Sequence, residues 1–481
     1  MFTNDSNKII KFLKNNKINK INSVKRIYGK FHKKYLDLSK KKIILSNENS
    51  QKNDVFLDNI DTCERKHYKQ KYRLNVDLVL SYLYKNHIDI IMKMINLHKY
   101  SDEKKKMIFD FLDNLEKYPG EYIIEWINKN GIELMRSLYI FLVNSRMPRE
   151  VYKIIGEEID IYGEFTSIDI QQEIELSLSE KVTKTYNCNG SFLNLVINSN
   201  KKNKISMNFI RRCFYLNNFT DIKKDINLKI WMSKIKKNLP KSRGEKFLGP
   251  KEVNTGCSSG YEISLWRKEE ISKVLIHEIM HHLSLERISD LTVLQDFVYE
   301  NFDIKRDITI NFFESYTEIW ANIINIFYIH FSNSKKTKKR KISDKNISVL
   351  EMLNLELTFS IFQCAKVLNF YGYKKIEDFC NKKKIKSNKF IQKSNVFSYY
   401  IGRSLLFYNF DKFIELCLKY NQKIIEYNIP VTEMLNLMED TINNKDYKKQ
   451  VNNFIEILNT QNLGMIGKTL RFSAIEQNYG F

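Results

Sequence analysis

Two histidines and a glutamate in the middle of the chain have the types and spacing that metal-assisted hydrolysis requires. Residues 277–281 have the sequence HEIMH, so the histidines are four positions apart. On a helix this spacing puts both imidazoles on one face, one turn apart, where they suit two corners of a tetrahedral zinc site. Glu278 is offset by about 100° around the helix, so it can take a proton from a metal-bound water without being a ligand.

The residues around this motif favour a buried helix over a chance match. Positions 274–283 contain apolar residues and histidines, with Glu278 as the only carboxylate and no lysine, arginine, proline or glycine. A chance match on a solvated helix would be surrounded by charges in a chain this rich in lysine. We therefore predict a metal-binding helix over residues 268–286.

A third protein ligand is expected from elsewhere, because catalytic zinc usually takes three side chains and leaves one position for water. Residues 311–330 form a second apolar helical pattern, and it carries Glu314 and Glu318 four positions apart. Two carboxylates on one face of an apolar helix are costly to bury unless a cation or hydrogen-bond donors meet them. This pair therefore supplies the candidates for the third ligand.

An HExxH motif followed some thirty residues later by two acids four apart resembles the gluzincin zinc metallopeptidases. By position, the resemblance implies that His277, His281 and Glu314 bind Zn²⁺ and that Glu318 accepts a hydrogen bond from a ligand imidazole. Many gluzincins have aspartate where this chain has Glu318. The longer side chain leaves its partner histidine open, and an exchange of roles between the two acids remains an alternative.

The order of segments over about residues 205–410 is similar to that of metallopeptidases encoded by nucleocytoplasmic large DNA viruses. Abundant lysine, asparagine and isoleucine fit an AT-rich viral genome, although many cellular genomes share that bias. The segments that carry the resemblance are KKNLP at 236–240, NTG at 254–256, WRKEE at 266–270, the HEIMH helix, ESYTEIWA at 314–321 and SYYIGR at 398–403.

The resemblance implies peptide-bond hydrolysis, with Glu278 as the general base and a tyrosine or histidine outside the metal motif as an additional donor to the oxyanion. We predict Tyr400 as this donor, with Tyr399 as the alternative, because the pair lies in an apolar helical segment beside Arg403. Two other functions stay open. One is a structural or inactive zinc-containing virion or nucleic-acid-associated protein, and the other is hydrolysis of a non-peptide amide.

The approach to the metal-binding helix combines a predicted loop and a predicted strand. Residues 240–260 hold two of the five prolines and four of the fifteen glycines, which indicates a loop, and Cys257 within it is expected to be a plain thiol. Residues 261–266 alternate as a half-buried strand does. The zincin resemblance suggests that this strand is a sheet edge that pairs with extended substrate, and an ordinary sheet strand is the alternative.

Composition sets outer limits on these predictions. The chain has 481 residues with 43% hydrophobic content, which is enough for two or three folded domains. No apolar run reaches the roughly 20 residues needed to span a bilayer, and the N-terminus lacks the pattern of a secretory signal. Seven scattered cysteines form no CxxC pair, which is typical of reduced thiols. We therefore expect a cytoplasmic protein, in host cytoplasm or virion if viral.

The formal net charge of +23 favours acidic partners, including nucleic acid. Its densest run, residues 335–341, could bind nucleic acid, but no aromatic residues are interleaved with it, so a solvated loop between helices is favoured. Residues 464–469, GMIGKT, are similar to the end of a phosphate-binding loop. Asn462 stands where its first glycine should be, and no strand pattern precedes it, so we assign it no such role.

Taken together, these patterns predict a mostly helical α+β protein. Residues 1–155 are expected to form a helical N-terminal domain, and residues 156–345 a zincin-like catalytic domain with a small sheet, an edge strand and both ligand helices. Residues 346–481 are expected to form a helical C-terminal subdomain that completes the cleft.

Overall fold

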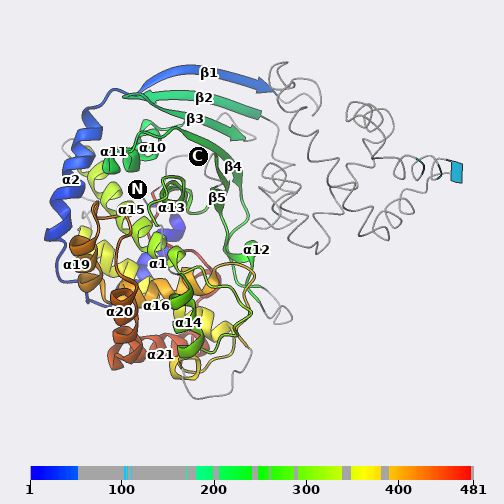
Figure 1. Cartoon of the computed structure of the whole chain (residues 1–481), viewed down its shortest axis with the longest axis vertical. Helices are drawn as coiled ribbons and strands as arrows, with labels where there is room; N and C mark the ends of the chain where they lie inside the picture. The colour runs from blue at the N-terminus through cyan, green and yellow to red at the C-terminus, as the bar shows by residue number, and fades with distance from the viewer. Residues whose placement is uncertain are drawn as a thin grey trace. The chain divides into compact units, whose positions relative to one another are not determined.

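A six-stranded mixed sheet and a larger number of helices make up the part of the chain that the computed structural model describes, which confirms an α+β protein (Figure 1). The chain divides into two units, one formed by Met1–Asn53 with Phe165–Phe481 and the other by Asp54–Glu164. The structure describes residues 2–52, 102, 103, 106, 110, 170, 180–198, 205–240, 247–258, 262–286, 291–337, 348–380 and 389–477.

The sheet has the strand order β1-β2-β3-β4-β6-β5. Strands β3, β4 and β6 are parallel neighbours, while β1 and β2 continue the sheet antiparallel on one side and β5 ends it antiparallel on the other. The strands are β1 (Ile44–Lys52), β2 (Glu180–Cys188), β3 (Ser191–Asn198), β4 (Ile226–Ser233), β5 (Gly256–Ser258) and β6 (Glu262–Arg267).

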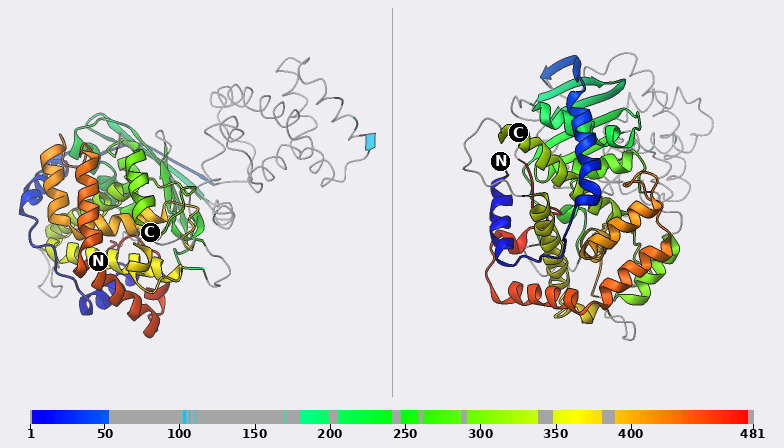
Figure 2. Two further views of the ribbon diagram at one scale, coloured as in Figure 1. Left: turned by 60° about the horizontal axis from the view of Figure 1, so that its bottom comes forward. Right: turned by 90° about the vertical axis from the view of Figure 1, so that its left-hand side faces the viewer.

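The helices gather on the concave side of the sheet and beyond it (Figures 1 and 2). The sheet curves over α10, α11, α13 and α15, and the later helices lie at the end farthest from it. The described helices are α1 (Asn4–Asn15), α2 (Lys25–Lys40), α10 (Met207–Cys213), α11 (Tyr215–Thr220), α12 (Pro250–Val253), α13 (Ile271–His282), α14 (Leu291–Asn301), α15 (Phe313–Thr337), α16 (Val349–Phe370), α17 (Ile376–Phe379), the π-helix η2 (Phe397–Gly402), α18 (Arg403–Tyr408), α19 (Phe410–Tyr420), α20 (Val431–Asn443), α21 (Lys445–Thr460) and α22 (Met465–Lys468).

The predicted strand at residues 261–266 is present as β6, but it is not a sheet edge. It pairs with β4 on one side and with β5 on the other, so β5 is the edge strand. The stretch predicted as a loop, residues 240–260, contains the helix α12 and the strand β5. Cys257 therefore lies in a strand. Gly256 permits the close pairing, because a Cβ there would lie 2.9 Å from the Ser264 carbonyl oxygen.

The N-terminal region also differs from the prediction. Helices α1 and α2 are present, but the strand β1 follows them. It pairs antiparallel with β2 and so belongs to the sheet and not to a separate helical domain. The two units divide the chain at other positions than the predicted boundaries at 155 and 345. The helical patterns at residues 76–83 and 108–115 lie outside the described residues, apart from residue 110.

Three further features bear on the sequence-based expectations. The basic run begins inside α15, and residues 338–341 lie outside the described residues. Residues 464–469 follow a helix, α21, and enclose only the four-residue α22, so they lack the strand and long helix of a phosphate-binding loop. None of the helices that the structure describes combines the length and apolarity needed to cross a membrane.

Residues 470–477, here called the C-terminal segment, pass through the core outside any helix or named strand. All eight are buried. The backbone N–H groups of Phe472 and Ser473 donate to the carboxylate of Glu270 at 2.9 and 2.6 Å, and those of Ala474 and Ile475 donate to Glu356 at 3.1 and 2.9 Å. Buried backbone donors need acceptors, and here two carboxylates supply what a neighbouring strand would.

Helix η2 approaches α15 closely at Gly402. A Cβ at this position would collide with Oγ of Ser315, which donates a hydrogen bond to the Ser398 carbonyl at 2.9 Å. We expect Gly402→Ala to lower the free energy of unfolding by about 1–3 kcal/mol, the usual cost of overpacking. Urea denaturation should measure this loss, and Gly402→Ala/Ser315→Ala should recover part of it because the colliding oxygen is gone.

Gly29→Ala provides the control, because this exposed glycine lies in α2 and an added Cβ would meet nothing within 4 Å. That substitution should raise the stability by about 0.5–1 kcal/mol, the helix propensity difference between the two residues. Equal stability of Gly402→Ala and the parent protein would contradict the tight η2–α15 packing.

Candidate metal centre

The candidate ligands come from two helices that pack against each other. α13 carries His277 and His281, and α15 carries Glu314 in its first turn. α13 is shorter than the predicted 268–286, and α15 begins two residues later and ends seven residues later than the predicted 311–330. The apolar residues of α13 are buried all round the helix, which explains why it contains so few charges.

Three ligand atoms converge between these helices. The Nε2 atoms of His277 and His281 are 2.9 Å apart, and Oε2 of Glu314 lies 3.1 and 3.3 Å from them. A tetrahedral zinc site with bonds of about 2.0–2.1 Å has about 3.3 Å between its ligand atoms. Among the described residues, these three form the group of histidine, cysteine and acidic side chains with the spacing of a metal site.

A carboxylate lies beside the other ring nitrogen of each histidine. Nδ1 of His277 is 2.8 Å from Oε1 of Glu318, and Nδ1 of His281 is 2.8 Å from Oε1 of Glu286. A carboxylate at this distance favours a proton on Nδ1, which leaves the Nε2 lone pair free for a cation. Both imidazoles thus point Nε2 toward the shared centre and Nδ1 toward a carboxylate, which is the orientation of metal-ligand histidines.

The charges around the histidines favour a cation at their centre. Burial opposes the charged form of both imidazoles and would lower their pKa. The carboxylates of Glu314 and Glu318 nevertheless raise the pKa of His277. Those of Glu314 and Glu286 raise the pKa of His281 well above its ordinary value. Burial alone would raise the pKa of Glu314, but the two imidazoles lower it to about 2. A divalent cation would relieve the same excess of negative charge that protons on the imidazoles relieve here.

Glu278 lies beside this centre without belonging to the triangle of ligand atoms. Its side chain is 5% exposed, and burial raises the pKa of its carboxyl above the ordinary range. The edge strand β5 packs close to it, since a Cβ at Gly256 would lie 3.3 Å from Cγ of Glu278. A carboxylate with a raised pKa is a better proton acceptor, which suits a general base.

Glu318 is held from three sides in a fully buried position. Its Oε1 contacts Nζ of Lys273 as well as His277, and its Oε2 lies 3.5 Å from Nη1 of Arg403. These charges lower the pKa of Glu318 despite its burial. Arg403 also donates to the carbonyl of Phe472, so the C-terminal segment is linked to His277 through two side chains.

The structure separates the two candidate tyrosines. Tyr400, the predicted oxyanion donor, is fully buried and donates its hydroxyl hydrogen bond to the Leu470 carbonyl at 2.6 Å, so it does not face the candidate ligands. The ring of Tyr399 lies 6.2 Å from that of His277, and the charge of Glu314 adds to burial in raising the pKa of the Tyr399 hydroxyl. Neighbouring helical residues point about a quarter turn apart, which explains the difference.

Sequence reasoning missed two residues at this centre. Glu286 lies beyond the end of α13 and returns to His281 because Ser284 adopts a left-handed conformation with φ of 54°. Asn395 donates to Oε1 of Glu314 at 3.1 Å and accepts from Asn311 at 3.0 Å. An acid five residues after the second histidine was a usable signal, whereas nothing in the sequence marks Asn395.

Comparisons with known proteins add no family to this picture: no protein-family model, curated protein or solved structure matches the chain significantly.

Proposed function

We propose that the protein is a zinc-dependent peptidase in which His277, His281 and Glu314 hold the metal and Glu278 acts as the general base. The observation that carries the proposal is the convergence of three ligand atoms at 2.9 to 3.3 Å, with a carboxylate beside each outer ring nitrogen. Two imidazoles and one carboxylate are a donor set of catalytic zinc, which leaves a fourth position open.

In the proposed reaction the chain contributes a base, a donor and a fixed geometry. Zinc, when bound, would polarise a water molecule and lower its pKa toward about 7. Glu278 would accept a proton from the water as its oxygen attacks the carbonyl carbon, and would return that proton to the amine nitrogen as the C–N bond breaks. Tyr399, in place of Tyr400, donates a hydrogen bond to the carbonyl oxygen of the scissile bond. Glu318 and Glu286 hold the two imidazoles in place.

The surroundings of α13 support a zincin-like arrangement for this unit. The helix packs against β5 and β6 at one end of the sheet, and β5 is antiparallel to its neighbour and forms the sheet edge. Extended peptides commonly bind proteins by lying along the edge strand of a sheet. β5 therefore takes the substrate-pairing role that the resemblance had suggested for residues 261–266.

Metal content tests the proposed ligands. Elemental analysis of the purified protein should give about one zinc per chain, and His281→Ala should lose it because two protein ligands hold zinc weakly. His330→Ala is the matched control, since His330 lies at the other end of α15 and interacts with Tyr28. Absence of bound metal from the parent protein, or equal zinc in both variants, would reject the site.

Cleavage of a mixed peptide library tests the reaction. The zinc-loaded protein should cleave peptides, a chelator should abolish cleavage, and added zinc should restore it. A protein that binds zinc in the predicted way but leaves every peptide intact would instead favour the structural role or hydrolysis of a non-peptide amide.

A further inference from the structure

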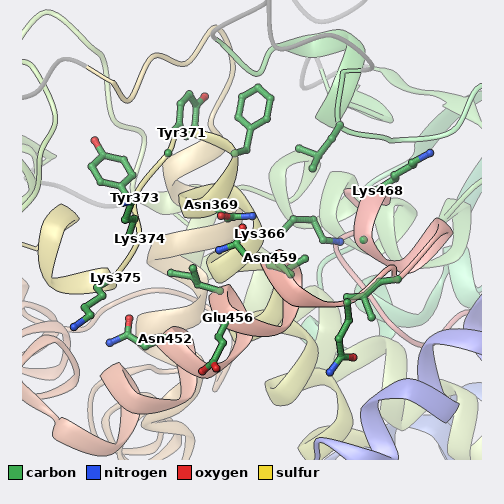
Figure 3. Close-up of a pocket in the computed structure, with 18 of the residues that line it drawn as sticks. Lys366, Asn369, Tyr371, Tyr373, Lys374, Lys375, Asn452, Glu456, Asn459 and Lys468 are labelled. Atoms are coloured by element: carbon green, nitrogen blue, oxygen red, sulfur yellow. The ribbon is translucent and has the colours of Figure 1, made fainter.

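A second site candidate lies among the C-terminal helices, built from none of the residues of the metal centre. A pocket of about 1320 Å³ is formed by the end of α16, the chain that follows it, the last turns of α21 and the short helix α22. Figure 3 shows Lys374 and Lys375 on one side of this pocket, Lys468 on the other, and Lys366 between them.

The lining is strongly basic. It contains five lysines and a single carboxylate, that of Glu456. Like charges around a hollow repel one another, and a concave surface concentrates their field, so the arrangement favours an anion from solution. The five lysines are Lys366, Lys374, Lys375, Lys389 and Lys468.

Ordinary structural roles do not explain three of these lysines, Lys374, Lys375 and Lys468. The described residues include ion pairs elsewhere, such as Lys412 with Asp440, but no pair joins a pocket lysine to a carboxylate. Lys374 and Lys375 directly precede the four-residue helix α17, whose first turn carries Glu377 and Asp378. The exposed side chains of Lys374, Lys375 and Lys468 thus have no structural partner in the described part of the chain.

Lys366 adds a buried amine to the wall. Its side chain is almost fully buried, and its Nζ donates to the carbonyls of Ile466 and Thr469 at 2.7 and 2.6 Å. An ammonium group has three N–H donors, so one remains beyond these two bonds. Burial without a carboxylate lowers the pKa of Lys366, and a nearby anion would favour its charged form.

The rest of the wall combines neutral hydrogen-bond donors with apolar and aromatic side chains. Five asparagines line the pocket, and their amide N–H groups can donate to anionic oxygens. Gly464 also lines it with φ of 53°, and its N–H donates to Oδ1 of Asn462 at 3.2 Å. The asparagines are Asn369, Asn452, Asn453, Asn459 and Asn462.

We propose that this pocket binds a small ligand with several consecutive phosphate groups, such as inorganic tripolyphosphate or the triphosphate of a nucleotide. Lysines on both sides of one hollow match a linear polyanion better than a single phosphate. Single-strand binders use an extended basic groove, whereas these lysines surround one hollow of about 1320 Å³, which suits a small molecule better. This site is independent of the proposed peptidase activity.

Titration of the full-length protein with tripolyphosphate tests the site, with calorimetry as the readout. Lys374→Ala/Lys375→Ala/Lys468→Ala should weaken binding by about tenfold or more, which corresponds to about 1.4 kcal/mol. The control is Lys25→Ala/Lys30→Ala/Lys33→Ala, which removes the same charge from exposed positions of α2. Thermal melting should show that both variants remain folded.

Titrations with ATP and with a single-stranded oligonucleotide show which kind of phosphate compound the pocket recognises. Equal affinities for tripolyphosphate and ATP would assign recognition to the phosphates alone, and a higher affinity for ATP would add the nucleoside, so both support the site. Absence of saturable binding, equal weakening in the α2 control, or binding of a single-stranded oligonucleotide without tripolyphosphate would overturn it. His281→Ala should bind tripolyphosphate normally, which separates this test from that of the peptidase.

Discussion

Replacing Glu278 with glutamine should lower the rate of peptide hydrolysis by about 10²–10⁴-fold and leave the zinc content unchanged. Glutamine fills the same volume beside β5 but cannot accept the proton of the attacking water. Because Glu278 is not one of the three converging side chains, metal affinity should be preserved.

The measurement is kcat and KM on a peptide that the parent protein cleaves, at saturating zinc. The loss should fall on kcat, since the proton transfer occurs only in the transition state. Glu415→Gln makes the same chemical change at an exposed position of α19 and should cleave at the parent rate. Undiminished hydrolysis by Glu278→Gln would remove this residue from the mechanism.

Replacing Glu318 with glutamine should lower the free energy of unfolding by about 3–5 kcal/mol, measured in urea with a chelator present. Lys273 and Arg403 would then be buried cations without their carboxylate. Zinc affinity should also fall by about 10–100-fold, because His277 loses the acceptor beside Nδ1. Competition with a zinc indicator would measure that second effect.

A double variant separates the two consequences. Lys273→Met/Glu318→Gln removes one uncompensated cation together with the acid, so part of the lost stability should return. Zinc affinity should stay low, because His277 still lacks its carboxylate. If Glu318→Gln bound zinc as tightly as the parent protein, Glu318 would stabilise the fold without orienting His277.

The pattern of the metal-binding helix could be predicted because it depends on local spacing. Periodicity places His277 and His281 on one face whatever surrounds the helix. The ends of α13 could not be predicted, since they depend on unusual backbone conformations, with φ of 62° at Glu270 and 54° at Ser284. Left-handed conformations are rare outside glycine, so nothing in the local pattern predicts that the helix ends there.

The choice between Tyr399 and Tyr400 depends on tertiary packing. Both belong to an apolar segment, and their side chains differ only in direction around η2, which is fixed by the close contact of Gly402 with α15. Likewise, β1 and the C-terminal segment obtain their backbone partners from residues far away in sequence, β2 in one case and Glu270 with Glu356 in the other. Local patterns carry no information on such distant pairing.

The C-terminal segment also sets a time order for assembly. The ribosome synthesises these residues after all the candidate ligands, yet Phe472 supplies the carbonyl that Arg403 binds and a ring 4.9 Å from that of Tyr399. Until the C-terminal segment emerges, the carboxylates of Glu270 and Glu356 lack the backbone N–H donors that it supplies. A nascent chain of that length contains every candidate ligand but not the segment that packs behind them. We therefore expect the proposed hydrolysis to depend on this segment.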